Sequence, residues 1–136
     1  PPAAQWALGE ALAPLLSEGV LVLASGSLTH DLRRLFAVRP MPASDAPEIA
    51  ETAAFRAWVA ERSAARDRDA LLDYRRAAPF GAAMHPTDEH WLPFYIAAGA
   101  GGMTNAPVRL HEGVTYGSLA MDAYAFGPEA GALAAV

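Results

Sequence analysis

The feature that most constrains the fold is an unbroken apolar run, Val20–Ala24, followed by the small residues Ser25–Ser27. A strand that is apolar at every position is typical of the middle of an α/β sheet, where both faces are covered. The small residues predict a tight turn, and a helix is expected from about residue 28 to residue 36. Open α/β sheets bind ligands at the carboxyl ends of their strands, and His30 lies in that position.

Helical periodicity and chain breakers predict the remaining elements. Helices are expected over 3–16, ended by Gly19, then over 48–63, over 67–78 with Asp67 as N-cap, and over 87–100 with Thr87 as N-cap. The tail predicts strands over 108–111 and 116–124 with a turn at 112–113, followed by loose residues from 127 to 136. Together the elements predict one α/β domain, residues 1–136, with a mixed β-sheet flanked by helices.

Composition narrows the possible functions. The net charge of −5 disfavours nucleic-acid binding, which usually requires a basic patch. The chain has no cysteine, so thiolate catalysis and cysteine-ligated metals are excluded, and a metal would have to be held by histidine and carboxylate. No long apolar run or signal peptide is present, so a cytoplasmic protein is expected, with no membrane contact.

The richest concentration of metal-ligand types is the stretch His85–Pro93, which holds two of the four histidines and two adjacent carboxylates. If Thr87 caps a helix, His90 lies in the first turn, where the helix dipole disfavours imidazolium and keeps the ring neutral for a metal. Glu89 could ligate or orient another ligand. In the alternative interpretation the acids only complement the helix dipole and His90 packs beside Trp91. Spacing alone does not separate the two interpretations.

The other histidines carry weaker signals. A single histidine on a helix is more often structural or exposed than catalytic, but the position of His30 after a buried strand keeps both interpretations open. His85 precedes a proline in a loop and is expected to be a bystander, and His111 is expected at the surface of an edge strand. No Gly-x-Ser-x-Gly nucleophile motif is present.

Two segments, 19–33 and 85–93, resemble the class III extradiol ring-cleavage dioxygenases (the LigB-like superfamily), in the branch that resembles DOPA 4,5-dioxygenase. Residues 55–59 and 117–122 are also similar to that family. The resemblance implies a non-haem metal, Fe(II) or Zn(II), with O₂ and a catechol-type aromatic substrate. It implies that His90 is a metal ligand, and that His30 moves protons at the substrate hydroxyl or is a further ligand in the zinc form. Glu89 would be a neighbour or an alternative ligand.

The chain departs from the family at its N-terminal side. Family members are considerably longer, and their first half carries a His-Gly-x-Pro-type and a Ser-x-His-type motif, neither of which is present here. Residues 1–136 are therefore expected to be the C-terminal half of a larger catalytic domain, completed by a missing half or by a partner chain. A non-catalytic subunit that uses the same fold for assembly is the alternative, and a zinc hydrolase that uses His and Glu is a weaker third possibility.

Overall fold

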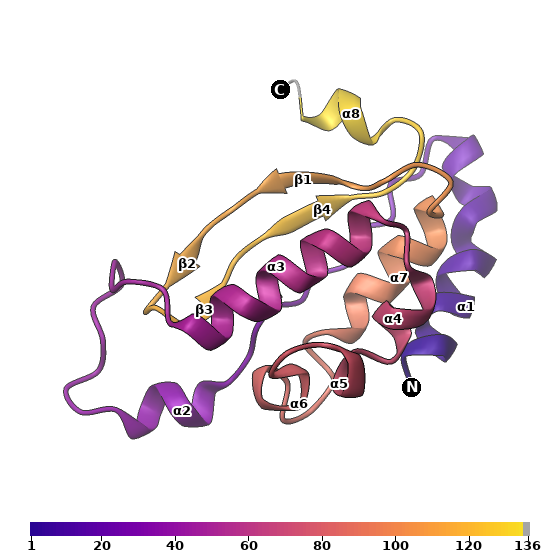
Figure 1. The fold of residues 1–136 in the computed structure, drawn as a ribbon. Coiled ribbons are helices and arrows are strands. Elements are labelled where there is room, and N and C mark those ends of the chain that lie inside the picture. The colour runs from indigo at the N-terminus through magenta and orange to yellow at the C-terminus, as the bar shows by residue number, and fades with distance from the viewer. Residues whose placement is uncertain (135–136) are drawn as a thin grey trace.

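The computed structural model describes residues 1–134. They form helices that pack together and a narrow β-ribbon that runs beside them (Figure 1). The helices are α1 (Pro2–Leu12), the 3₁₀ helix η1 (Ala13–Glu18), α2 (Leu32–Ala37), α3 (Ala50–Ala64), α4 (Arg68–Leu72), α5 (Tyr74–Ala77), α6 (Gly81–Met84), α7 (Leu92–Gly101) and α8 (Ala130–Leu133). The strands are β1 (Val108–His111), β2 (Val114–Thr115), β3 (Leu119–Ala120) and β4 (Ala123–Ala125). The predicted α/β class is confirmed.

The described strands form two antiparallel pairs. β1 pairs with β4, with Val108 opposite Ala125, and β2 pairs with β3, with Val114 opposite Ala120. In Figure 1 the two pairs follow one another as a ribbon that runs alongside α3. The predicted turn at 112–113 separates β1 from β2, but these two strands do not pair with each other.

Helices α1 and α7 pack with their backbones in contact. A Cβ atom added to Gly9 would lie 2.2 Å from the carbonyl oxygen of Ile96, and one added to Gly99 would lie 2.2 Å from that of Trp6. Only glycine fits at these two crossing points. The predicted first helix is therefore confirmed, with a change to 3₁₀ geometry around Pro14 and an end at Gly19, whose φ is +78°.

The core is a cluster of aromatic side chains between α3, α5 and α7. Trp91 and Tyr95 are buried, the indole N–H of Trp91 donates to the Tyr95 hydroxyl (2.7 Å), and that hydroxyl donates to the carbonyl of Leu71 (2.5 Å). Asp67 caps α4, as predicted, by accepting from the backbone N–H of Ala70. The polar atoms of Trp91 and Tyr95 thus have partners, which offsets the cost of burying them.

The strand predicted at Val20–Ala24 is wrong. The segment is extended but belongs to no sheet, and the side chains of Leu21 and Leu23 are 73% and 85% exposed. Within residues 1–134, no backbone hydrogen bond involves residues 21–26. A strand needs a neighbour to pair with, and the described chain places none beside this segment.

Two helix starts and the tail also differ from the prediction. The helix expected from Thr87 begins at Leu92, because the Thr87 hydroxyl donates to Glu89 instead of capping and the carbonyl of Asp88 accepts from the backbone N–H of Trp91. The helix expected from residue 28 begins at Leu32, where Asp31 caps it. Part of the tail predicted to be loose forms α8, while residues 135 and 136 lie outside the described residues. None of the described helices has the length and apolar character needed to cross a membrane.

Candidate metal and catalytic site

The structure brings His30 and His90 together. Their imidazole rings stack with centroids 3.5 Å apart and planes 19° apart. His30 lies in the loop before α2, and His90 lies in the turn before α7, so neither is held on a regular element. Because His90 precedes the helix instead of lying in its first turn, the argument from the helix dipole does not apply to it.

Backbone contacts between the two loops fix this stack. The N–H of Ser27 donates to the carbonyl of His90 (2.8 Å), and the N–H of His30 donates to the carbonyl of Met84 (2.8 Å). Gly26 lets the loops approach, since a Cβ there would lie 2.4 Å from the His90 carbonyl oxygen. The small residues after the apolar run therefore serve a close backbone approach, in addition to the turn that the sequence predicted.

Electrostatics at the stack favour a neutral His30. Burial lowers the pKa of His30, and the neighbouring His90 lowers it further, against the smaller opposing effect of Glu89. Hydrogen bonds from its own backbone N–H and from the Thr87 hydroxyl lower the pKa of Glu89. The Glu89 carboxylate lies 3.9 Å from Nε2 of His90, which places an anion beside the ring. A neutral imidazole is the state in which a histidine can bind a metal, and the lowered pKa of His30 favours that state.

These donors fit a non-haem metal in chemistry but not in arrangement. Imidazole nitrogen and carboxylate oxygen suit iron or zinc, and a catalytic zinc commonly has three protein ligands. Among residues 1–134, no group of three or more histidine and acidic side chains is close enough to hold an ion. An imidazole nitrogen binds a metal through a lone pair that lies in the plane of its ring. Because the two rings are stacked and nearly parallel, these lone pairs do not point to one position, so at least one ring would have to turn before both could bind the same ion.

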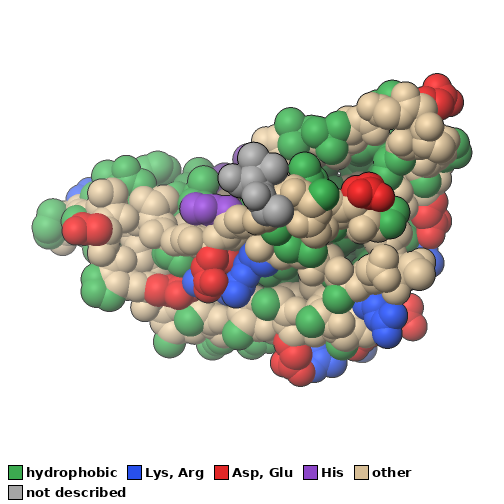
Figure 2. Space-filling model, turned by 90° about the horizontal axis from the view of Figure 1, so that it is seen from above, with side chains coloured by type: hydrophobic (Ala, Val, Ile, Leu, Met, Phe, Trp, Pro, Cys, Tyr) green, Lys and Arg blue, Asp and Glu red, His purple; other side chains and the backbone are tan. Residues whose placement is uncertain are grey.

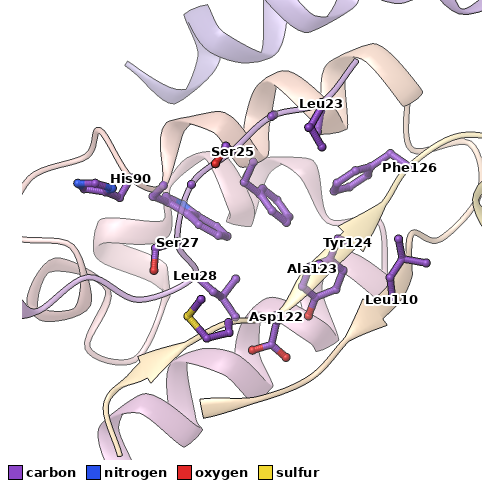
Figure 3. Close-up of a pocket in the computed structure, with 16 residues that line it drawn as sticks. Leu23, Ser25, Ser27, Leu28, His90, Leu110, Asp122, Ala123, Tyr124 and Phe126 are labelled. Atoms are coloured by element: carbon purple, nitrogen blue, oxygen red, sulfur yellow. The ribbon is translucent and has the colours of Figure 1, made fainter. Parts of the chain in front are cut away.

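An open groove of about 370 Å³ runs beside the stack. Residues 23–28 form one wall, the β4 region forms the other, and Trp91 and Phe94 of the core contribute to its lining. In Figure 3 the extended segment and β4 run along opposite sides of the groove, while His90 lies at one end with its ring pointing away from the centre. The groove is predominantly apolar, so it suits an apolar side chain or an aromatic ring.

A buried arginine beside the groove was missed from sequence. Arg56 on α3 bonds Asp122 through two contacts (2.7 and 3.0 Å), Glu48 (2.9 Å) and Glu112 (3.3 Å). The hydrogen bond to Asp122 is the main reason that the pKa of Arg56 is raised. The Asp122 side chain is completely covered and also lines the groove, so this network fixes the wall between β3 and β4. The sequence feature that could have identified Arg56 is its position as a charged residue inside the apolar stretch Phe55–Val59.

Other charged side chains pair at the surface. Figure 2 shows basic and acidic groups lying next to each other, and Arg109 contacts Glu112 at 2.9 Å. His111 is exposed on β1, as expected. His85, expected to be a bystander, is instead completely buried, and burial lowers its pKa to about 4.

The fold and the histidine motifs match a known family. Residues 1–127 match the family described as "Catalytic LigB subunit of aromatic ring-opening dioxygenase", and the chain belongs to this family. The resemblance inferred from the two histidine motifs is thereby confirmed.

Relatives with assigned names make the match more particular. The chain is 31% identical over 124 residues to 4,5-DOPA dioxygenase extradiol of Beta vulgaris and 32% identical over 125 residues to that of Portulaca grandiflora, covering 88% of this chain and 42% of each relative. A solved structure, the uncharacterized protein JW3007 from Escherichia coli K12, superposes with a TM-score of 0.74 at 29% identity, over 90% of this chain and 49% of that one. The chain thus spans less than half the length of these relatives.

Proposed function

We propose that residues 1–136 form the C-terminal half of an extradiol-type dioxygenase site, which opens the ring of a catechol-like aromatic with O₂. The observation that carries the proposal is the contact between His30 and His90, each within a motif that resembles the family. Bound Fe(II) or Zn(II) would supply open positions for oxygen donors and Lewis acidity. In this proposal His90 is a metal ligand, and His30 takes a proton from the substrate hydroxyl and returns it, or ligates in the zinc form.

We further propose that a complementary half-domain, on the same polypeptide or on another chain, completes the site. The described residues supply two stacked imidazoles and one nearby carboxylate, which do not converge on one point as the three protein ligands of a typical catalytic centre do. The relatives are more than twice as long as the matched segment, so they contain enough chain for a second half.

The extended segment offers a docking edge for that half. Within residues 1–134 the backbone groups of residues 21–26 make no backbone hydrogen bond, Leu21 and Leu23 are exposed, and the groove separates this segment from β4. A strand of the complementary half added to this edge would satisfy the backbone groups and bury Leu21 and Leu23. The same addition would turn the segment into the buried strand that its sequence pattern predicts.

A non-catalytic role is the second candidate function. The absence of a three-ligand group within residues 1–134 favours a subunit or binding domain that keeps the fold for assembly alone. Both functions use the same docking edge and differ only in whether a metal is held and oxygen consumed.

The discriminating experiment is a ring-cleavage assay on the chain joined to its complementary half. The assembly is loaded anaerobically with Fe(II), then exposed to O₂ with a panel of catechols, and the yellow ring-opened product is recorded. We expect His90→Ala and His30→Ala to abolish colour and His111→Ala to leave it unchanged, since His111 is exposed on β1. Iron bound without product from any catechol would refute the dioxygenase proposal and favour the non-catalytic one.

A further inference from the structure

We propose that His85 is a positioning residue, which holds the His30 loop in register with His90 through a hydrogen bond to the backbone of Leu28. The catalytic meaning of this role rests on the proposed function, but the positioning itself can be measured without any activity. His85 was expected to be a bystander, but the structure buries its side chain and bonds it to the loop that carries His30.

The first observation is that His85 is locked in one state. Its side chain is completely buried, and its Nε2 lies 2.8 Å from the carbonyl oxygen of Leu28. A carbonyl only accepts, so Nε2 must carry the hydrogen. Nδ1 is also buried and has no hydrogen-bond partner among the described residues. The ring is therefore the neutral Nε2–H tautomer, and among residues 1–134 the bond to Leu28 is its one hydrogen bond.

The second observation is where that bond falls in the chain. Leu28 is two residues before His30 and lies between two backbone contacts already described, Ser27 to His90 and His30 to Met84. Three hydrogen bonds thus join residues 27–30 to residues 84–90. The bond from His85 is the central one, and of the three it alone is made by a side chain. A change at position 85 therefore tests the register of the loops without altering the backbone.

The third observation is that the far side of His85 is rigid. Its ring packs against Phe55 and Trp91, with centroids 5.7 and 5.5 Å away. Its own carbonyl accepts from Arg75 (2.9 Å), and Arg75 also contacts Asp88. The donor that reaches Leu28 is consequently fixed to the aromatic core, whereas the loop that receives it carries His30.

This geometry explains why a histidine is needed where a phenylalanine would fill the same space. Phenylalanine would keep the aromatic packing but leave the buried carbonyl of Leu28 without a donor. An unsatisfied buried acceptor is unfavourable, so the loop would move to reach water or another donor. Because His30 follows two residues later, that movement would separate its ring from His90.

The test compares His85→Phe, which removes the donor, with His85→Gln, whose side-chain amide reaches approximately as far as Nε2. The 136-residue chain is labelled with ¹³C,¹⁵N-histidine, and nuclear Overhauser contacts and ring-current shifts between His30 and His90 are recorded by NMR. The exposed His111 serves as the internal reference, and the indole N–H of Trp91 reports whether the core is intact.

We expect His85→Phe to lose the contacts between His30 and His90 and their ring-current shifts, with the Trp91 signal retained, and His85→Gln to keep all of them. If both variants keep the stack, or if His85→Gln loses it with an intact core, the proposal is wrong. Should His85→Phe fail to fold, the result for His85→Gln decides, because the proposal requires that an amide donor alone preserves the stack.

A second readout connects positioning to catalysis. In the iron-loaded assembly with the complementary half, we expect kcat to fall by about tenfold or more in His85→Phe, with KM nearly unchanged and rescue in His85→Gln. If wild type shows no ring cleavage, the proposed function fails while the NMR result for His85 still stands. If wild type is active and His85→Phe keeps full kcat, the catalytic part of the inference is wrong.

Discussion

Two apolar regions of this chain have opposite structural environments. Tyr74, Trp91 and Tyr95 lie at 0–1% exposure, packed between helices, with their polar atoms hydrogen-bonded. The segment Val20–Ala24 is as apolar, yet Leu23 is 85% exposed. Helices satisfy their own backbones and need only side-chain contacts, whereas a strand also needs a neighbouring backbone. Apolar sequence is therefore sufficient for the helical core but not for the strand.

The two histidines lie at the boundary between these regions. His90 directly precedes Trp91, at the edge of the packed core, while His30 follows the exposed segment by a few residues. His90 is therefore attached to the packed core, whereas the position of His30 depends on what pairs with residues 21–26. Substitutions and pH can change the packed core and the exposed segment separately.

The largest effect on stability is expected when a core aromatic is truncated, compared with truncation of a residue in the exposed segment Val20–Ala24. Trp91→Ala removes a buried ring and its hydrogen bond to Tyr95, so we expect the free energy of unfolding to fall by about 3–5 kcal/mol. Leu23→Ala, the matched control, should change it by less than about 0.5 kcal/mol, because the side chain is already in solvent. Urea unfolding of both variants measures the difference. A comparable loss in Leu23→Ala would show that the edge is packed in solution.

A smaller loss of folding stability is expected when the pH is lowered. Burial lowers the pKa of His85 to about 4, whereas the unfolded chain has the ordinary value near 6.5. Between these values the unfolded state binds more protons, so stability is full above pH 6.5 and is lost as the pH falls toward 4. The difference between pKa values of 6.5 and about 4 corresponds to about 3 kcal/mol.

This acid sensitivity is measured against His85→Gln, which cannot titrate at position 85. The unfolding free energies of both proteins are followed from pH 7 to pH 4, and other acid-sensitive groups cancel in the difference. We expect the advantage of wild type over His85→Gln to shrink by about 3 kcal/mol over this interval. Parallel curves would contradict the buried, neutral state of His85.

The part of the fold that sequence could predict is the part that local rules determine. Periodicity identified α1, α3 and α7, and side-chain chemistry identified the cap at Asp67 and the helix end at Gly19. The run Val20–Ala24 was predicted as a strand because its pattern is that of a buried strand. The apolar pattern of this run fits a strand that is covered on both faces and paired with a neighbour. Residues 1–134 contain no neighbouring strand that pairs with it.

The candidate site was predictable only in part. The proximity of His30 and His90 followed from motifs that resemble a family, while the start of α7 was misplaced because the hydroxyl of Thr87 binds Glu89 instead of capping. The environments of His85 and Arg56 depend on contacts between residues far apart in sequence, from His85 to Leu28 and from Arg56 to Asp122. No local pattern identifies such partners.

The smallest effect on stability, but a clear one on association, is expected from charging the edge. The double variant Leu21→Glu and Leu23→Glu should change the unfolding free energy of the chain by less than about 0.5 kcal/mol, since both side chains are exposed. It should weaken binding of the complementary half by more than about tenfold, because strand addition would bury both charges. Affinity is measured by titration calorimetry.

The control for the edge is Leu133→Glu, which changes an equally apolar residue that is 51% exposed on α8, away from the groove lining. We expect this variant to bind the complementary half as wild type does. Equal loss of affinity in both variants would show that the effect is general charge repulsion, and unchanged affinity in the double variant would place the docking surface elsewhere.

We propose that this chain supplies part of a metal site which a second half completes. This proposal is tested most directly by measuring bound iron and zinc after dialysis, for the chain alone and for its assembly with the complementary half. We predict near-stoichiometric metal in the assembly, loss of that metal in His90→Ala, and at least about 100-fold weaker binding by the chain alone, in which too few ligands converge. Tight stoichiometric metal in the isolated chain, or full occupancy in the His90→Ala assembly, would contradict the account.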